Sequence, residues 1–218
     1  VRDDESGTFW TPTPLPVREL DAYRARHGQG YTVFEHNSHA IEQELVVFVP
    51  VAPGLPVRIQ RLRLRNRSTR RRRLSVIAFV EWTLGTDREE NQLHVVTQWD
   101  FQSRTMLARN FRRSDYGSTV AFASLIPGAN SFTADRAEFL GRNGNWRWPR
   151  AMRREALSGR VGTGMDPCAA LQCVVELAPD EQREIVFLLG QGADLGEVRS
   201  LVSHFQAPRA VEEAFLNS

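Results

Sequence analysis

Lysine is absent from this chain of 218 residues, so all 28 basic side chains are arginines. Against 26 acidic residues they leave a formal net charge of only +2. A compositional bias of the genome is the simplest explanation for the missing lysine. Arginine also forms two-pronged hydrogen bonds with carboxylates and phosphates and stacks on rings, which lysine does not do.

Cysteine is nearly absent as well. The two cysteines, Cys168 and Cys173, are five positions apart on a predicted strand, where odd and even positions face opposite sides. A disulfide between them would oppose that geometry. Reduced thiols and a cytoplasmic location are therefore expected.

Long apolar runs are missing. No stretch approaches the roughly 20 residues that a membrane helix needs, and the start carries no signal segment. The composition, 41% hydrophobic and 25% charged, is typical of a soluble globular protein with one core. Because the sequence starts within a motif and ends within a helical pattern, we expect a piece of a longer protein, so missing signals say little about the parent.

Short strands separated by turn residues fill most of the chain, which predicts an all-β sandwich or barrel. The segment 39–49 alternates apolar and acidic residues, as a half-covered strand does. The segment 57–66 also alternates, but its parity slips at Gln60 and Arg61, which suggests a β-bulge. The segment 73–84 is apolar on both parities, so we expect a central strand covered on both faces. Further strands are expected at 94–101, 105–111, 118–126 and 169–177, the last forming a hairpin-like pair with 184–189. The segment 131–140 is expected to be a strand or a bent segment.

The last residues change character. Asp194 with Glu197 forms a capping box, and apolar residues follow at helical spacing. Pro208 is suited to the first turn of a second helix that carries Phe215. We therefore divide the chain into a β-domain at 1–192 and linker helices at 193–218.

Two early segments, 3–14 and 23–32, carry aromatic, arginine, histidine and glycine residues that no strand period explains. Loops on a rigid scaffold often carry binding residues. Trp10 and Tyr31 would offer flat faces for sugar rings. Arg26 and His27 would donate hydrogen bonds to hydroxyl or phosphate groups, and Gly28 would let the backbone come close. The alternative is a loop that packs its own aromatic rings onto the sandwich.

Other chemistry has weak support. The five histidines and two cysteines lack the spacing of a metal site, and Gly-x-Ser-x-Gly does not occur. The run from Arg58 to Arg73 holds nine arginines without interleaved aromatic residues, so we expect a solvated or domain-docking face and no nucleic-acid partner. Carboxylate pairs such as Glu42 with Glu44 are expected to be surface charge.

The two early segments resemble a known family. The patterns Asp-x-x-Ser-Gly-x-Phe-Trp-Thr-Pro-Thr at 3–13 and Tyr-x-x-Arg-His-Gly-x-Gly-Tyr-Thr at 23–32 are similar to the N-terminal domain of glycoside hydrolase family 94. The segments 135–142, 166–172 and 187–190 resemble its later blocks. The details most resemble the cyclic β-1,2-glucan synthase branch, and are also similar to cellobiose and chitobiose phosphorylases.

The resemblance implies a galactose-mutarotase-like supersandwich of two large antiparallel sheets with a short helical tail. In the parent, a helical barrel that carries the catalytic Asp would follow, so this piece would be inactive alone. It would shape a site for β-linked glucan and contact the barrel or a second copy in a homodimer. The candidate substrate-binding residues are Arg26, His27, Gly28, Tyr31 and Trp10, with no catalytic or metal residue.

No cofactor is implied, although inorganic phosphate would be the co-substrate of a phosphorylase parent. The parent of the synthase branch would be anchored in the inner membrane through other domains. Two alternatives stay open. One is an aldose epimerase-like enzyme that pairs His94 with Glu42 or Glu81 as acid and base. The other is a structural scaffold without ligand contact, favoured if Arg26 and His27 are buried in salt bridges.

Overall fold

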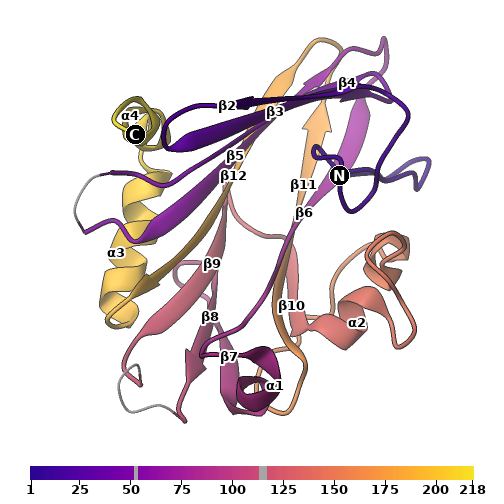
Figure 1. Ribbon diagram of the computed structural model, residues 1–218. Coiled ribbons are helices and arrows are strands. Elements are labelled where there is room, and N and C mark those ends of the chain that lie inside the picture. The colour runs from indigo at the N-terminus through magenta and orange to yellow at the C-terminus, as the bar shows by residue number, and fades with distance from the viewer. Residues whose placement is uncertain (52–53, 113–116) are drawn as a thin grey trace.

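Two antiparallel sheets pack face to face in the computed structural model, which describes residues 1–51, 54–112 and 117–218 (Figure 1). The smaller sheet has the order β1 (Arg2–Asp3), β6 (Arg72–Glu81), β11 (Pro167–Leu177), β10 (Ser131–Asp135). The larger has the order β2 (Tyr23–His27), β3 (Tyr31–Ser38), β4 (Ile41–Phe48), β5 (Val57–Asn66), β12 (Gln182–Gly192), β9 (Val120–Ile126), β8 (Thr105–Asn110), β7 (Val95–Asp100). The predicted supersandwich is confirmed.

The main core lies between the sheets. Inward-facing side chains such as Leu64, Leu74, Met106 and Leu171 have no exposed surface. Burying side chains of this size contributes roughly 1.5–3 kcal/mol each. This layer is the largest continuous source of stability in the described chain.

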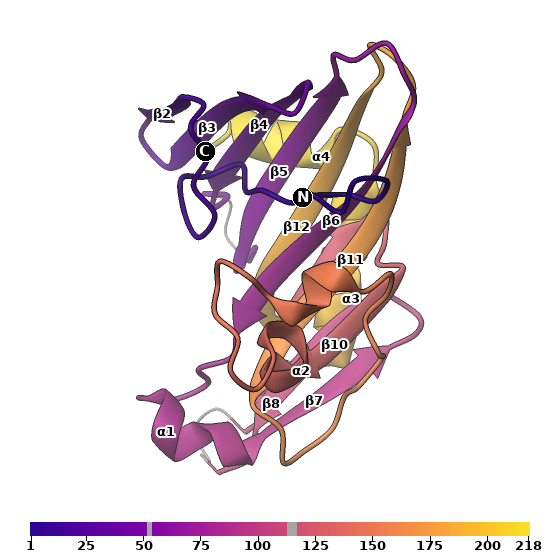
Figure 2. The same ribbon diagram turned by 90° about the vertical axis from the view of Figure 1, so that its right-hand side faces the viewer.

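The outer face of the smaller sheet is covered by the helix α2 (Arg136–Leu140) and the 3-10 turn η3 (Arg150–Arg153), as Figure 2 shows. Ile77 and Phe79 of β6 pack beneath them, while Leu74 and Val76 face the main core. The prediction that this strand is central and covered on both faces is confirmed. The segment 131–140, expected to be a strand or a bent segment, is half strand and half helix, because Asp135 caps α2 by accepting hydrogen bonds from the next turn.

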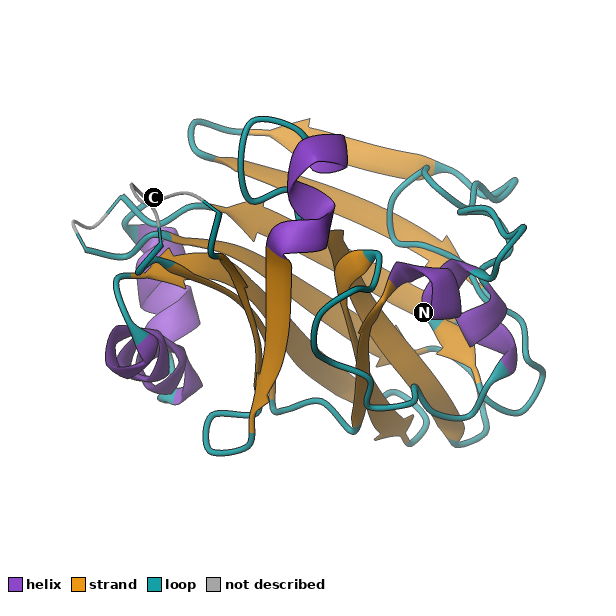
Figure 3. Cartoon of the chain, turned by 90° about the horizontal axis from the view of Figure 1, so that it is seen from below, coloured by secondary structure: helices purple, strands orange, loops and turns teal. Residues whose placement is uncertain are grey.

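The helices α3 (Leu195–Gln206) and α4 (Ala210–Leu216) lie on the other side of the sandwich, against one half of the larger sheet (Figure 3). Val198 and Phe205 are buried there against sheet residues that include Ile59. Asp194 accepts a hydrogen bond of 2.9 Å from the Glu197 backbone, so the predicted cap is confirmed. The prediction that Pro208 lies in the first turn of the second helix is wrong, because α4 begins two residues later, at Ala210.

The charged segment before β7 contains the short helix α1 (Arg88–Asn91) and the turn η1 (Gln92–His94). No helix among residues 1–51, 54–112 and 117–218 is long and apolar enough to cross a membrane.

The predicted bulge in β5 is wrong. Its pairing with β4 and with β12 runs without a shift through Gln60 and Arg61. The apolar pattern changes parity because the strand is covered on different faces along its length. Val57 and Ile59 face α3 and α4, whereas Leu62 and Leu64 face the main core.

The predicted hairpin of β11 and β12 is also wrong, since the two strands belong to different sheets. The turn between them crosses from one sheet to the other, as does the turn from β5 to β6. Asn66 joins both turns, because its side-chain amide donates to the carbonyl oxygens of Arg70 at 2.7 Å and Leu177 at 3.0 Å. The periodicity of the sequence locates β11 and β12 but does not show to which sheet each strand belongs.

Candidate functional site

The segment 23–32 forms a hairpin at the edge of the larger sheet. It was expected to be an irregular loop, but β2 and β3 pair from Tyr23 with His36 to His27 with Thr32. The Gly28 N–H donates to the Tyr31 carbonyl oxygen at 3.0 Å, which closes the turn. Gly30 takes a φ of 85°, a conformation that glycine adopts without strain.

Arg26 lies on the outer side of this hairpin. Its Nη2 donates to Glu35 Oε1 at 2.7 Å, and its side chain is 60% exposed. Arg24 Nη1 lies 3.8 Å from the other oxygen of the same carboxylate. Glu35 therefore orients Arg26 while leaving hydrogen-bond donors accessible, as a ligand contact requires.

Gly28 and Tyr31 are in direct contact. A side-chain carbon at Gly28 would lie 2.3 Å from the Tyr31 ring. The same ring packs edge-on against Phe215 of α4, with centroids 5.2 Å apart. Position 28 therefore requires glycine, because any side chain there would overlap the Tyr31 ring. The ring in turn connects the tip of the hairpin to α4.

His27 faces the other side of the hairpin, because strand neighbours alternate. Its Nδ1 lies 3.0 Å from Thr32 Oγ1, and the residue is exposed. The structure therefore brings Arg26 and Tyr31 to one face, with Gly28 between them, and places His27 behind.

Trp10 does not join this group. Its side chain has no exposed surface, and its Nε1 donates to Gln43 Oε1 at 2.9 Å inside the main core. The prediction that its ring is free to stack on a sugar disagrees with this placement. No sequence pattern indicates that Trp10 is buried, because it precedes the first long strand and belongs to no periodic pattern.

The root of the hairpin is fixed by the half-buried carboxylate of Glu19. Glu19 Oε2 lies 2.9 Å from His36 Nε2, and its Oε1 lies 2.5 Å from His39 Nε2. The buried ring of His36 also stacks on Tyr23, with centroids 3.7 Å apart. Burial alone would raise the pKa of Glu19, but these side-chain hydrogen bonds hold that pKa below its ordinary value. The segment before β2 is thereby attached to the sheet.

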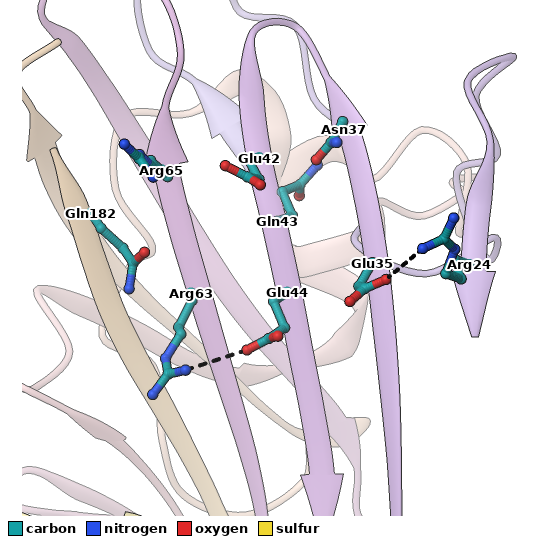
Figure 4. Close-up of a pocket in the computed structure, with 9 residues that line it drawn as sticks. All are labelled: Arg24, Glu35, Asn37, Glu42, Gln43, Glu44, Arg63, Arg65 and Gln182. Atoms are coloured by element: carbon teal, nitrogen blue, oxygen red, sulfur yellow. Dashed lines mark hydrogen bonds and ion pairs between the residues drawn. The ribbon is translucent and has the colours of Figure 1, made fainter. Parts of the chain in front are cut away.

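A polar groove of about 420 Å³ begins beside Arg24 and runs over the uncovered half of the larger sheet (Figure 4). It is lined by three arginines, three glutamates and three amides: Arg24, Arg63, Arg65, Glu35, Glu42, Glu44, Asn37, Gln43 and Gln182. Arg63 Nη1 lies 3.5 Å from Glu44. Charges of both signs alternate across neighbouring strands, so the groove can bind hydroxyl-rich ligands but has no aromatic platform.

The arginine run is largely neutralised. Among the described residues, every arginine from Arg58 to Arg73 except Arg58 forms an ion pair with a carboxylate. Arg72 differs from the expected solvated face, because it is buried and bound to Asp3 at 2.5 Å. This pairing leaves little free positive charge for a polyanion.

The carboxylates considered for acid–base chemistry have structural partners. Glu42 pairs with Arg67 at 2.8 Å, and Glu81 pairs with Arg88 at 2.9 Å. No hydrogen bond or ion pair within the described chain joins His94 to either of them. Glu81 lies in the smaller sheet, while His94 precedes the far edge of the larger one. The acid–base pair of an epimerase is therefore not assembled.

Metal ligands are not gathered either. Among residues 1–51, 54–112 and 117–218, no three His, Cys, Asp or Glu side chains form a group that could hold a metal ion. Arg26 and the groove offer hydrogen bonds and charge, the chemistry of binding and orientation.

The described residues form a two-sheet supersandwich whose edge hairpin carries the exposed Arg26. The sequence profile of the glycosyl hydrolase 94 supersandwich domain matches residues 1–208. The chain belongs to this family.

Its relatives are longer proteins. The chain is 34% identical over 209 residues to a cyclic β-(1,2)-glucan synthase from Rhizobium meliloti, covering 95% of this chain and 7% of that protein. It is 31% identical over 221 residues to a solabiose phosphorylase from Paenibacillus borealis, covering 99% of this chain and 28% of that protein. Among solved structures, a putative aldose 1-epimerase from Escherichia coli K12 has a TM-score of 0.43 at 7% identity, covering 79% of this chain and 69% of that one.

Proposed function

We propose that this chain is a non-catalytic module of an enzyme that synthesises or phosphorolyses a β-linked glucan, and that its β2–β3 hairpin forms part of the sugar site. Arg26 donates hydrogen bonds to a sugar hydroxyl or to phosphate. Gly28 lets the ligand approach the backbone of the turn, and Tyr31 packs the turn against α4. His27 supports the strand pair from behind.

The observation that supports this proposal is that the Arg26 guanidinium is both oriented and accessible. It is held by Glu35 at 2.7 Å, yet 60% of its side chain is exposed. A scaffold role would be favoured by burial of both Arg26 and His27 in salt bridges, and both residues are exposed. An oriented, accessible guanidinium suits recognition of an oxygen-rich ligand.

The proposal extends to the parent enzyme. The helices α3 and α4 would lead from the sandwich to a helical-barrel domain that supplies the catalytic acid, with inorganic phosphate as co-substrate if the parent is a phosphorylase. A homodimer would let the hairpin reach the site of a partner subunit. A cytoplasmic location, with the parent held at the inner membrane by other domains, is compatible with the two free cysteines.

The test uses a full-length enzyme that contains this chain and follows phosphate-dependent release of sugar phosphate from β-1,2-glucan and from cellobiose. Arg26→Ala is expected to lower kcat/KM by roughly tenfold or more, as loss of a charged hydrogen bond does. The melting temperature should stay unchanged, because Arg26 is exposed.

Arg71→Ala is the matched control. Arg71 is also exposed and ion-paired, with Glu176 at 3.2 Å, but lies at the turn between the sheets. Equal kinetics of Arg26→Ala and Arg71→Ala would show that the hairpin does not contact the sugar, and would favour the scaffold.

A further inference from the structure

A second group of aromatic residues belongs to the segment between α2 and η3 and to the segment after β1. The helix α2 lies on the outer side of the smaller sheet, away from the hairpin of the larger sheet (Figure 2). Trp148 is 67% exposed and packs edge-on against Phe9, with ring centroids 5.5 Å apart. Trp146 is 37% exposed and stands on Phe79 in the same way at 4.9 Å. Exposed tryptophan is uncommon unless it contacts something, because its large apolar ring is costly to leave in water.

Trp148 is held in place by its neighbours. The Asn145 Oδ1 accepts hydrogen bonds from the backbone of Arg147 at 2.9 Å and of Trp148 at 3.0 Å. Pro149 follows directly and begins η3. A ring fixed in this way loses little conformational freedom on binding.

Arg2 fastens η3 to the sheet. It is buried, and its guanidinium donates to the carbonyl oxygens of Met152 and Arg154 and to Ser75 Oγ at 3.0 Å. Arg2 is also the bridge partner of Phe9. Arg2 thus positions Phe9 through its backbone and η3 through its side chain.

An open cavity of about 520 Å³ adjoins this place and is lined by Arg2, Asp4, Glu5, Gly7, Arg73, Met152, Arg153, Arg154 and Glu155. Its size is that of a small-ligand site. Within the described chain, the side chains of Arg153 and Glu155 form no hydrogen bond or ion pair. A free donor group and a free acceptor group therefore face the cavity beside the aromatic pair.

We propose that Trp148, Phe9 and this cavity, here called the Trp148 platform, bind one stretch of a neutral oligosaccharide chain. The apolar face of a pyranose ring stacks on the Trp148 indole. Arg153 donates to ring hydroxyls, and Glu155 accepts from them. The glycan class rests on the proposed function, but the site and its residues are independent of the hairpin.

Other ligand classes fit less well. A nucleic acid needs an excess of free positive charge, whereas Arg73 lies 3.6 Å from Asp4, Arg154 lies 3.0 Å from Glu138, and Glu155 adds a free negative charge. A protein partner needs a desolvated apolar centre. The platform is instead one exposed indole beside a polar cavity, which is the combination that suits a sugar.

The experiment is affinity electrophoresis of the 218-residue chain in native gels with and without soluble linear β-1,2-glucan. The chain should be retarded by the glucan, and Trp148→Ala should weaken this binding roughly five- to tenfold, as loss of one aromatic contact does. Arg153→Ala and Glu155→Gln should weaken it by smaller factors. Circular dichroism checks that each variant is folded.

Phe101→Ala is the matched control, because Phe101 is 83% exposed in the turn after β7 and has no place in the platform. Its binding should equal that of the unaltered chain. Equal binding of Trp148→Ala and Phe101→Ala would overturn the proposal, as would the absence of any retardation by glucan.

The two proposals are separated by their measurements. Failure of the hairpin proposal shows in the kinetics of the full-length enzyme, and failure of the platform shows here. Full protection of the Trp148 indole from fluorescence quenchers in the full-length enzyme without glucan would also overturn the proposal, since another domain would then cover the ring.

Discussion

Asn66 donates a hydrogen bond of 3.0 Å to the carbonyl oxygen of Leu177, 111 residues further along the chain. The same amide nitrogen lies 3.1 Å from the Ala178 carbonyl oxygen. Because the chain passes between the two sheets at both places, this one side chain holds the sheets in register at that end of the sandwich.

Asn66→Ala is therefore expected to lower the free energy of unfolding by about 2–4 kcal/mol, since buried carbonyl groups lose their donor. Urea unfolding measures the change. Ser68→Ala removes only a hydroxyl that binds Asn66 Oδ1 at 2.6 Å, and should cost less than about 1 kcal/mol. If Asn66→Ala and Ser68→Ala lowered the free energy of unfolding equally, the hydrogen bonds of Asn66 to the two turns would not be what stabilises this end of the sandwich.

Trp10→Ala should destabilise the fold by about 3–5 kcal/mol, because it removes a fully buried ring. Trp10→Phe should cost about 1–2 kcal/mol, since Gln43 Oε1 would lose its donor. Thermal unfolding measures both. If a Trp10→Phe enzyme were as stable as the unaltered one but bound sugar more weakly, the result would support the prediction that Trp10 contacts the sugar.

Gly28→Ala should displace the Tyr31 ring, because the new carbon would lie 2.3 Å from it. In a Tyr31→Ala background the same change should have little effect. A double-mutant cycle on stability and on sugar affinity isolates the coupling, which we expect to be about 1–2 kcal/mol. Additive effects would show that the hairpin relaxes around the new methyl group.

Arg199 of α3 binds Asp100 of β7 with two hydrogen bonds, of 3.0 Å and 2.7 Å. The Arg199 hydrogen bonds hold the pKa of the Asp100 carboxyl well below its usual range. A lowered pKa gives stability that is present above the unfolded value of about 3.9 and is lost as the pH falls through the folded value.

Arg199→Ala should therefore be less stable than the unaltered chain at pH 7, and the difference should shrink below about pH 4. Chemical unfolding at a series of pH values measures it. Arg71→Ala, in which an exposed ion pair is lost, should show almost no difference at any pH. A difference for Arg199→Ala that does not depend on pH would mean that packing, and not charge, is lost.

The two cysteines should be unreactive in the folded chain. Burial raises the pKa of the Cys173 thiol to about 11 and also raises that of Cys168. Since the thiolate is the reactive form, a thiol reagent at pH 8 should label both only after denaturation. Fast labelling of the folded chain would show that the β11 strand opens.

Strand positions could be predicted from the sequence wherever one face of a strand is buried. The patterns of β4 and β6 are local, so alternation was enough to find β4, and an apolar run on both parities was enough to find β6. The sheet to which a strand belongs is a property of distant contacts, and Asn66 with Leu177 shows why the pairing of β11 with β12 was misjudged. The parity change in β5 likewise depends on α3 and α4, which come more than 120 residues later.

The candidate site was predictable in part. Arg26, Gly28 and Tyr31 are predicted as site residues from their residue types and from the family resemblance, and the structure places them on one face of the hairpin. Glu35, which orients Arg26, was missed because β3 was not recognised as a strand. An alternation beginning at Val33 opposite a Gly-x-Gly turn was the available signal.

The larger sheet is covered by helices over only half of its outer face, so the side chains on the outer face of β5 are buried at one end of the strand and exposed at the other. These two groups of side chains should tolerate substitution differently. Polar replacements at Val57 or Ile59 should be rejected in a saturation library, while Arg63 and Arg65 should accept most residues. Arg61 lies between the two groups, since it is buried with its guanidinium 5.2 Å from the centroid of the Phe215 ring. The range of residues accepted at this position would therefore measure how strongly α4 packs against the sheet.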